Sequence, residues 1–201
     1  MERLRVDGGA RGLLYVPAGV GPELPTPLVL LLHGAGAAAQ HGLDLLIGQA
    51  DDAGLILLAP SSQGGTWDLV LDGDGPDVAL IDRMLAEVFQ RLPVDLTRLA
   101  VGGFSDGASY AISLGLTNGD LFSHVLAFSP GFAAPARRRG RPRLFVSHGT
   151  RDRLLPIHAC SRRLVPGLRQ AGDQVRYREF EGGHTIPAAV ARDAVAWFAG
   201  S

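Results

Sequence analysis

Three side chains in the sequence have the types and the chain order that catalysis by a nucleophilic serine requires. Ser105 lies in the pentapeptide GFSDG at residues 103–107, a G-x-S-x-G pattern, and Asp152 and His184 follow it. A serine hydroxyl becomes an effective nucleophile when an imidazole takes its proton and an acid holds that imidazole in the right tautomer. The order Ser, Asp, His is one of the orders in which this chemistry recurs.

The pentapeptide itself predicts a tight turn between a strand and a helix. The apolar run 99–101 precedes it and a helix-like stretch, 108–116, follows it. Small residues on both sides of the serine permit such a turn and leave the hydroxyl exposed at its tip. The chain has 27 glycines, so a match by chance is not rare, and the pattern gains its weight from this context.

Asp152 and His184 are expected in loops that follow two later strands. The loop HGTRD at 148–152 comes after an apolar strand at 144–147, and EGGH at 181–184 comes after the last strand, 175–180. The carboxyl ends of parallel strands meet at one edge of a sheet, which would bring these loops to Ser105. Considered alone, an Asp between two arginines, such as Asp152, is typical of a surface ion pair. A His after two glycines, such as His184, is typical of a turn. Asp173, Glu179 and Glu181 are less favoured as the acid of the triad, because none of them lies in a strand-end loop ahead of the histidine.

Acyl transfer also needs two N–H groups that bind the oxyanion of the tetrahedral intermediate. The first is expected from the backbone of Asp106, at the start of the helix. The second is expected from Ala35, in the loop HGAG at 33–36, where glycines such as Gly34 let the backbone approach a substrate. The Asp106 carboxylate would oppose the developing charge unless it points outward, and the positive end of the helix dipole offsets part of this.

These loops belong to short apolar runs that alternate with longer amphipathic ones. That pattern predicts one α/β domain, residues 1–201, with a mostly parallel sheet and helices on both faces. The expected strands are 28–32, 55–59, 98–102, 124–128, 144–147 and 175–180, with an edge strand at 13–16 that Pro17 ends. The expected helices are about 37–53, 78–91, 105–117, 158–170 and 187–199.

Composition excludes several classes of function. The net charge of −1 gives no global field for nucleic acid or for an acidic membrane. No apolar stretch approaches the length of a bilayer span, so stable membrane insertion is not expected. There is no lysine, which removes Walker A and Schiff-base chemistry, and the one cysteine, Cys160, favours a cytoplasmic location. A monomer or a homodimer is expected.

Two cofactor hypotheses fail on spacing. GAGAAA at 34–39 fits the dinucleotide pattern G-x-G-x-x-A, but the next strand, 55–59, ends without the acidic residue that the pattern requires. The six histidines show no metal-binding spacing, and His33 and His148 are expected to hold loops together. We therefore expect neither a metal nor another cofactor.

Together, these motifs resemble the α/β-hydrolase superfamily, and within it the small carboxylesterase group that includes phospholipase/carboxylesterase-type enzymes and acyl-protein thioesterases. The matching pieces are LHGAG at 32–36, GFSDG at 103–107, HGTRD at 148–152 with Leu155 and Pro156, and GGH at 182–184. The resemblance implies Ser105, Asp152 and His184 as the triad, and Ala35 with Asp106 as the oxyanion pair.

The chain departs from this group in three respects. Asp106 stands where the group often has Asn, Gln or Met, and the early strands look trimmed. No room for a cap domain exists between residues 128 and 144, so an uncapped site is expected.

Substrate contacts are expected from the loop 64–76, which carries Trp67 and Leu69. Trp67 either forms a wall of an acyl pocket or fixes the loop onto the body of the protein. We expect a small-molecule ester with a short- to medium-chain acyl group as the substrate. The alternatives are an acyl-protein thioesterase or lysophospholipase, and a non-catalytic binding protein on the same fold. The arginine-rich segment 133–142 is expected to be a solvated loop, with an acidic or phosphate partner as its alternative.

Overall fold

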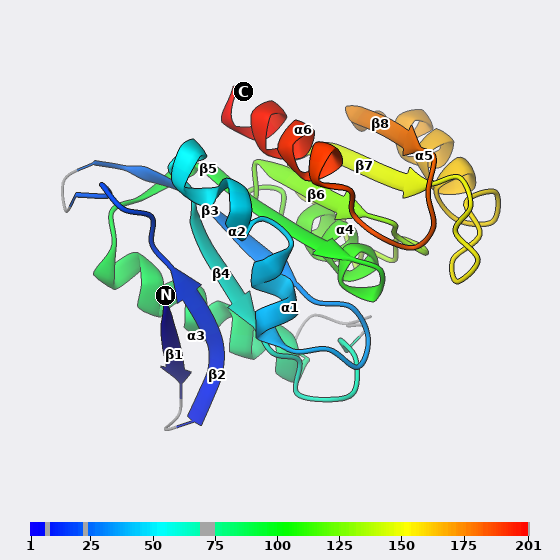
Figure 1. Ribbon diagram of the computed structural model, residues 1–201. Coiled ribbons are helices and arrows are strands. Elements are labelled where there is room, and N and C mark those ends of the chain that lie inside the picture. Colours follow the sequence, from blue (N-terminus) through cyan, green and yellow to red (C-terminus); the bar gives the residue numbers. More distant parts are fainter. Residues whose placement is uncertain (7–8, 22–23, 69–74, 201) are drawn as a thin grey trace.

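The fold is a single eight-stranded sheet between two layers of helices, shown by a computed structural model that describes residues 1–6, 9–21, 24–68 and 75–200 (Figure 1). The order of strands across the sheet is β1-β2-β4-β3-β5-β6-β7-β8. β2 pairs antiparallel with β1 and with β4, and all other pairs are parallel. The strands are β1 (Glu2–Val6), β2 (Gly9–Tyr15), β3 (Thr26–Leu32), β4 (Ile56–Pro60), β5 (Val94–Phe104), β6 (His124–Phe128), β7 (Arg143–Gly149) and β8 (Val175–Phe180).

Helices cover both faces of this sheet. In Figure 1, α1, α2 and α6 lie on one face, and α3, α4 and α5 lie on the other. The helices are α1 (Ala39–Asp44), α2 (Ile47–Ala53), α3 (Pro76–Arg91), α4 (Asp106–Thr117), α5 (Ser161–Gln170) and α6 (Ala188–Ala199). The predicted α/β architecture, a mostly parallel sheet with helices on both sides, is confirmed.

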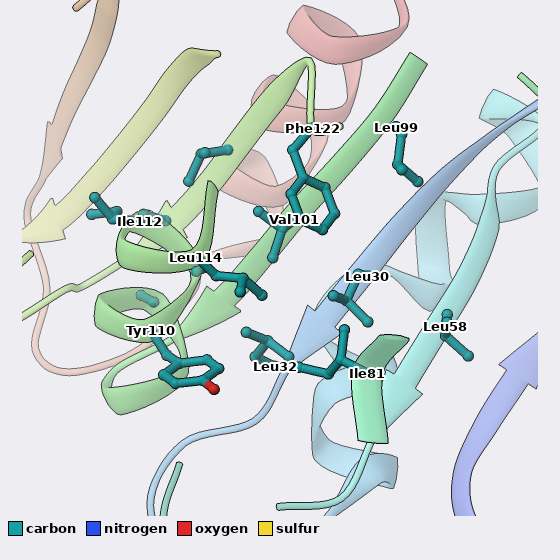
Figure 2. Close-up of a cluster of buried hydrophobic side chains, with 14 of the residues drawn as sticks. Leu30, Leu32, Leu58, Ile81, Leu99, Val101, Tyr110, Ile112, Leu114 and Phe122 are labelled. Atoms are coloured by element: carbon teal, nitrogen blue, oxygen red, sulfur yellow. The ribbon is translucent and has the colours of Figure 1, made fainter. Parts of the chain in front are cut away.

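The central strand β3 explains why two cores form. All seven of its residues are buried, and side chains of a strand alternate between the two faces. Leu28 and Leu30 enter the core beneath α3, α4 and α5, whereas Val29 and Leu31 enter the core beneath α1, α2 and α6. Figure 2 shows the first of these cores, in which leucines of the strands meet side chains of α3 and α4. A continuous apolar run is thus what a strand covered on both faces requires.

Two expectations about the N-terminal half are wrong. The strand predicted at 13–16 is β2, and it does not lie at the edge, because β1 pairs outside it. The early strands are therefore present and not trimmed. β1 escaped prediction because the described part of it is mostly exposed, with Leu4 as its buried residue, so it has no apolar run.

The single helix expected at 37–53 is also wrong, since the chain forms α1 and α2 with a break between them. Leu46, at the start of α2, has φ −133° and ψ 0°, which is not helical. Leu43, Leu46 and Ala50 are fully buried and lie at the i, i+3, i+7 spacing that one continuous helix would also show. The apolar pattern therefore could not reveal the break.

The connection between β6 and β7 bears on access to the sheet edge where the predicted site lies. Residues 129–142 are all described, and they contain no helix and no strand apart from one isolated bridge at Gly140. The predicted absence of a cap at this position is thus confirmed. Across the described ranges, none of the helices combines the length and the apolar character needed to cross a membrane.

Candidate active site

The register of the parallel strands brings the expected site loops together. Phe104 of β5 lies opposite Phe128 of β6, and Gly149 of β7 lies opposite Phe180 of β8. These residues end their strands, so the loops after β5, β7 and β8 all leave from the same edge of the sheet. In an open α/β sheet this carboxyl edge is where ligands bind.

Ser105 lies in a strained turn between β5 and α4. Its φ of 58° and ψ of −118° are unusual for a residue other than glycine, and its N–H donates to Phe128 O at 2.9 Å. A Cβ on Gly103 would lie 2.4 Å from Gly107 O, and one on Gly107 would lie 2.3 Å from Leu32 O. Neither position has room for a Cβ atom, which explains why both flanking positions of the G-x-S-x-G pattern are glycine.

Asp152 and His184 are hydrogen-bonded across two loops. His184 Nδ1 donates to Asp152 Oδ2 at 2.6 Å, while Asp152 Oδ1 accepts from the N–H groups of Leu154 and Leu155, both at 2.9 Å. Burial alone would raise the pKa of Asp152, but the N–H of Leu155, His184 and the N–H of Leu154 outweigh it and hold that pKa below its usual value. The carboxylate is thus kept ionised beside the imidazole.

The other ring nitrogen of His184, Nε2, has a lone pair that can accept a proton. Because Nδ1 donates to the carboxylate, the neutral ring carries no proton on Nε2. This Nε2 atom is buried and has no hydrogen-bond partner within the described part of the chain. The ring of His184 lies 4.5 Å, between centroids, from that of Phe104, the residue before Ser105. The ring that carries this unprotonated nitrogen therefore packs against the residue that precedes the serine.

Two backbone N–H groups remain available beside this turn. Gly36 N–H donates to Gly65 O at 2.8 Å, and Ala37 N–H donates to Gly34 O at 3.2 Å. The N–H groups of Ala35 and Asp106, by contrast, have no partner among the residues that the structure describes. These are the two N–H groups that the sequence assigns to the oxyanion.

The Asp106 side chain turns toward His33 and Trp67. Burial raises the pKa of this carboxyl, opposed by the N–H of Trp67 and by the charge that His33 would carry. Its Oδ2 atom is buried and unpartnered in the described part of the molecule.

The three residues expected to contact substrate differ in their placement. A Cβ on Gly34 would lie 3.5 Å from Ser105 Cβ, so this glycine contacts the nucleophile turn. Trp67 is only 3% exposed, and its indole stacks on the ring of Tyr110 and packs at a tilt against the ring of His33. This packing fixes the loop to the body of the protein, as in the second of the two arrangements considered, and a contact between Trp67 and substrate stays a prediction. Leu69 lies outside the described residues.

Sequence reasoning missed the contact between His148 and Asp152. His148 Nε2 donates to Leu155 O at 2.8 Å and lies 3.3 Å from Asp152 Oδ2, while its Nδ1 accepts from the Ser161 hydroxyl at 2.7 Å. Burial lowers the pKa of His148, opposed by Leu155 O and Asp152. The available signal was the HG pair at 148–149, three residues before the acid. It indicated that His148 holds the loop together, but it did not identify Asp152 as its partner.

Ser109, one helical turn after the nucleophile, was also missed. Its hydroxyl donates to Ser105 O at 3.3 Å and accepts from the N–H groups of Gly131 and Phe132. It thereby ties the loop after β6 to the turn that carries Ser105. A small polar residue on a buried helix face was the only signal in the sequence.

Comparisons with known proteins agree with this fold. The chain is similar to the crystal structure of esterase PE8, with 26% identity over 93% of this chain and 96% of that one, and a TM-score of 0.75. It shares its fold with a carboxylesterase of Bacillus cereus (22% identity, 92% of each chain, TM-score 0.64). It also shares its fold with an S-formylglutathione hydrolase from Agrobacterium tumefaciens (18% identity, 93% and 88%, TM-score 0.69). Comparison with curated protein sequences gave no match.

The decisive comparison is at the level of the family. The sequence profile described as "Phospholipase/Carboxylesterase" matches residues 78–198, which is more than half of the chain and includes Ser105, Asp152 and His184. The chain therefore belongs to the phospholipase/carboxylesterase family of α/β-hydrolases, a family of serine hydrolases.

Proposed function

We propose that this protein is a carboxylesterase that hydrolyses short- to medium-chain acyl esters through an acyl-enzyme on Ser105. His184 acts as general base and acid, Asp152 fixes its tautomer, and the N–H groups of Ala35 and Asp106 bind the oxyanion. The 2.6 Å hydrogen bond between His184 Nδ1 and Asp152 Oδ2 carries the proposal, because it leaves the lone pair of Nε2 free to accept a proton.

The first half of the reaction acylates the serine. His184 Nε2 takes the hydroxyl proton of Ser105 as Oγ attacks the ester carbonyl, a C–O bond forms, and the carbonyl oxygen becomes an oxyanion. The N–H groups of Ala35 and Asp106 stabilise this charge. The bond to the alcohol then breaks, and His184 gives its proton to the departing oxygen.

The second half frees the acid. His184 takes a proton from water as the water oxygen adds to the acyl carbon, and the oxyanion forms again at the same two N–H groups. When the bond to Oγ breaks, His184 returns the proton to Ser105. Asp152 stays ionised throughout and stabilises the imidazolium in both halves.

The acyl-chain range rests on exposed apolar side chains near these loops. Phe132 is 39% exposed and its N–H bonds to Ser109, whereas Leu154 is 69% exposed and its N–H bonds to Asp152. Each CH₂ buried against such a surface contributes about 0.8 kcal/mol, or about fourfold in kcat/KM. For p-nitrophenyl esters we expect kcat/KM to rise with chain length and to level off before about twelve carbons, because the surface is small. A continued rise beyond that length would contradict the proposed range.

A fluorophosphonate probe tests the mechanism directly. We expect one covalent adduct, located on Ser105 by peptide mass, and no adduct in His184→Ala. The matched control is His158→Ala, since His158 is an exposed histidine outside the proposed triad, and it should label at the wild-type rate. A folded wild-type protein that does not label would overturn the proposal and would favour a binding protein on the same fold.

A thioesterase acting on acylated proteins is the second candidate. The uncapped connection between β6 and β7 favours it, since a capped site would exclude a macromolecular substrate. Rates measured side by side on matched ester and thioester substrates distinguish the two. A kcat/KM higher by tenfold or more for an acylated peptide thioester would replace the esterase assignment.

A further inference from the structure

The segment 61–68, which we call the clasp, contacts the loop 33–36 that provides the proposed oxyanion donor, here called the oxyanion loop. The clasp follows β4, and the oxyanion loop follows β3, which pairs with β4. Gly36 N–H donates to Gly65 O at 2.8 Å, and Ser62 N–H donates to His33 Nε2 at 3.0 Å. Neither contact involves Ser105, Asp152 or His184, so the clasp lies outside the proposed triad.

His33 determines which way the Ala35 N–H points. Because its Nε2 accepts from Ser62, the ring carries its proton on Nδ1, which donates to Gly34 O at 2.8 Å. No peptide bond in the described chain is cis, and the C=O and N–H of a trans peptide point in opposite directions. The side chain that holds Gly34 O therefore directs the Ala35 N–H away from the His33 ring.

Trp67 holds His33 in turn. Its Nε1–H donates to His33 O at 2.8 Å, a hydrogen bond that is buried. The indole lies 4.7 Å from the His33 ring and 5.5 Å from the Tyr110 ring, measured between centroids. The backbone and the ring of His33 are thus both fixed by one side chain of the clasp.

Two carboxylates fasten the clasp to the helices behind it. Asp68 accepts from the Tyr110 hydroxyl of α4 at 2.7 Å and from Asp77 N–H of α3 at 3.0 Å. Asp77, which is 1% exposed, accepts from Gln63 N–H at 2.8 Å and from Asp68 N–H at 2.9 Å. Figure 2 shows Tyr110 on α4, the helix that begins directly after Ser105. The clasp therefore connects the oxyanion loop to the helix of the nucleophile.

We propose that Trp67 and Asp68 are positioning residues for catalysis, which hold the oxyanion loop so that the Ala35 N–H meets the oxyanion. This role rests on the proposed function and assigns a task to residues that touch neither the triad nor the substrate. It predicts a defect in stabilising the transition state rather than in binding the ester. A pocket-wall role for Trp67 predicts the reverse.

The variant Trp67→Phe tests the proposal, because it removes the N–H and retains an aromatic ring. Loss of one oxyanion donor lowers kcat by about 10²–10³-fold, so a misdirected donor should lower kcat by about tenfold to 100-fold, with KM within about twofold of wild type. The Ki of a trifluoromethyl ketone, which forms a hemiketal oxyanion on serine, should rise by the same factor. The matched control is Trp197→Phe on α6, where the indole packs against His124 and Phe145 and should leave both constants unchanged.

The outcomes separate this proposal from the proposed function. If wild type labels with the fluorophosphonate and Trp67→Phe retains the wild-type kcat and Ki, the clasp has no positioning role. A raised KM with unchanged kcat would also overturn it. If Trp67→Phe does not fold, Tyr110→Phe decides, since it removes only the hydroxyl that holds Asp68. That variant should lower kcat by about threefold to tenfold at constant KM, less than the full effect of a lost hydrogen bond to a charged group because the bond acts on the oxyanion loop only through Asp68 and Trp67, and an unchanged kcat would refute the proposal.

Discussion

His124 makes the stability of the protein depend on pH in a way that can be calculated. It begins β6, is 5% exposed, and packs edge-on against Trp197 and Phe198 at 5.1 Å between centroids. Its Nδ1 contacts the Ser123 hydroxyl at 3.0 Å, while its Nε2 is buried without a partner in the described residues. Burial, with a smaller contribution from the charge of Arg143, lowers its pKa from 6.5 to about 4.

The sign of the effect follows from the direction of this shift. Between pH 6.5 and about pH 4 the unfolded chain binds a proton at His124 that the folded protein does not, so stability falls as the pH falls through this window. At about pH 5 the linkage relation gives a loss of about 2 kcal/mol relative to about pH 7.5. Below the folded pKa the loss approaches about 3 kcal/mol.

Urea denaturation of wild type and His124→Phe, each at about pH 7.5 and about pH 5, measures this contribution. The wild type should lose about 2 kcal/mol more than the variant between the two pH values, because every other titrating group is common to both proteins. Comparing the two losses removes the direct effect of the substitution on packing. If the losses agree within about 0.5 kcal/mol, His124 is not held neutral and the reasoning fails.

Three further substitutions have expected outcomes. Asp152→Asn should lower kcat by about 10⁴-fold, because the amide no longer fixes the Nδ1–H tautomer of His184. Stability should change little, because the amide oxygen can still accept from the N–H groups of Leu154 and Leu155. A kcat within tenfold of wild type would refute this. Gly107→Ala should lower the free energy of unfolding by about 2 kcal/mol or more, since its Cβ would lie 2.3 Å from Leu32 O, and a thermal melt equal to that of wild type would contradict the contact. Arg138→Ala should destabilise by about 1–2 kcal/mol at unchanged kcat, because it leaves the buried carboxylate of Asp173 without the guanidinium that bonds both of its oxygens; chemical denaturation and steady-state kinetics check the two halves of this prediction.

The sequence was sufficient to predict the elements buried on both faces. β3 and β6 are fully buried, and their continuous apolar runs predicted them. The same logic failed for β1, whose side chains are mostly exposed, and for the break between α1 and α2, where the apolar spacing suits either one helix or two. Periodicity reports burial, so it carries no signal where burial is slight or where two conformations bury the same residues.

Candidate site residues could be proposed because their position in a loop was predictable from the strand before it. The register of β5 with β6 and of β7 with β8 follows from the parallel sheet, so one fold prediction placed three loops. The clasp could not be predicted in this way. Asp68 and Asp77 are paired by side-chain bonds to each other's N–H groups, and no periodicity or turn rule specifies such a pairing. Trp67 was singled out by size alone, and its partner His33 lies far away in the sequence.

The short connection between β6 and β7 has a consequence for the fate of the acyl-enzyme. Residues 129–142 form no cap over the carboxyl edge of the sheet, and Ser105 is half-buried among the described residues, so the proposed acyl-enzyme is open to nucleophiles other than water. Small alcohols can then compete with water for attack on the acyl carbon, according to their concentration and nucleophilicity. In water–alcohol mixtures the enzyme proposed here becomes a transferase, and the ratio of new ester to free acid reports how open the site is.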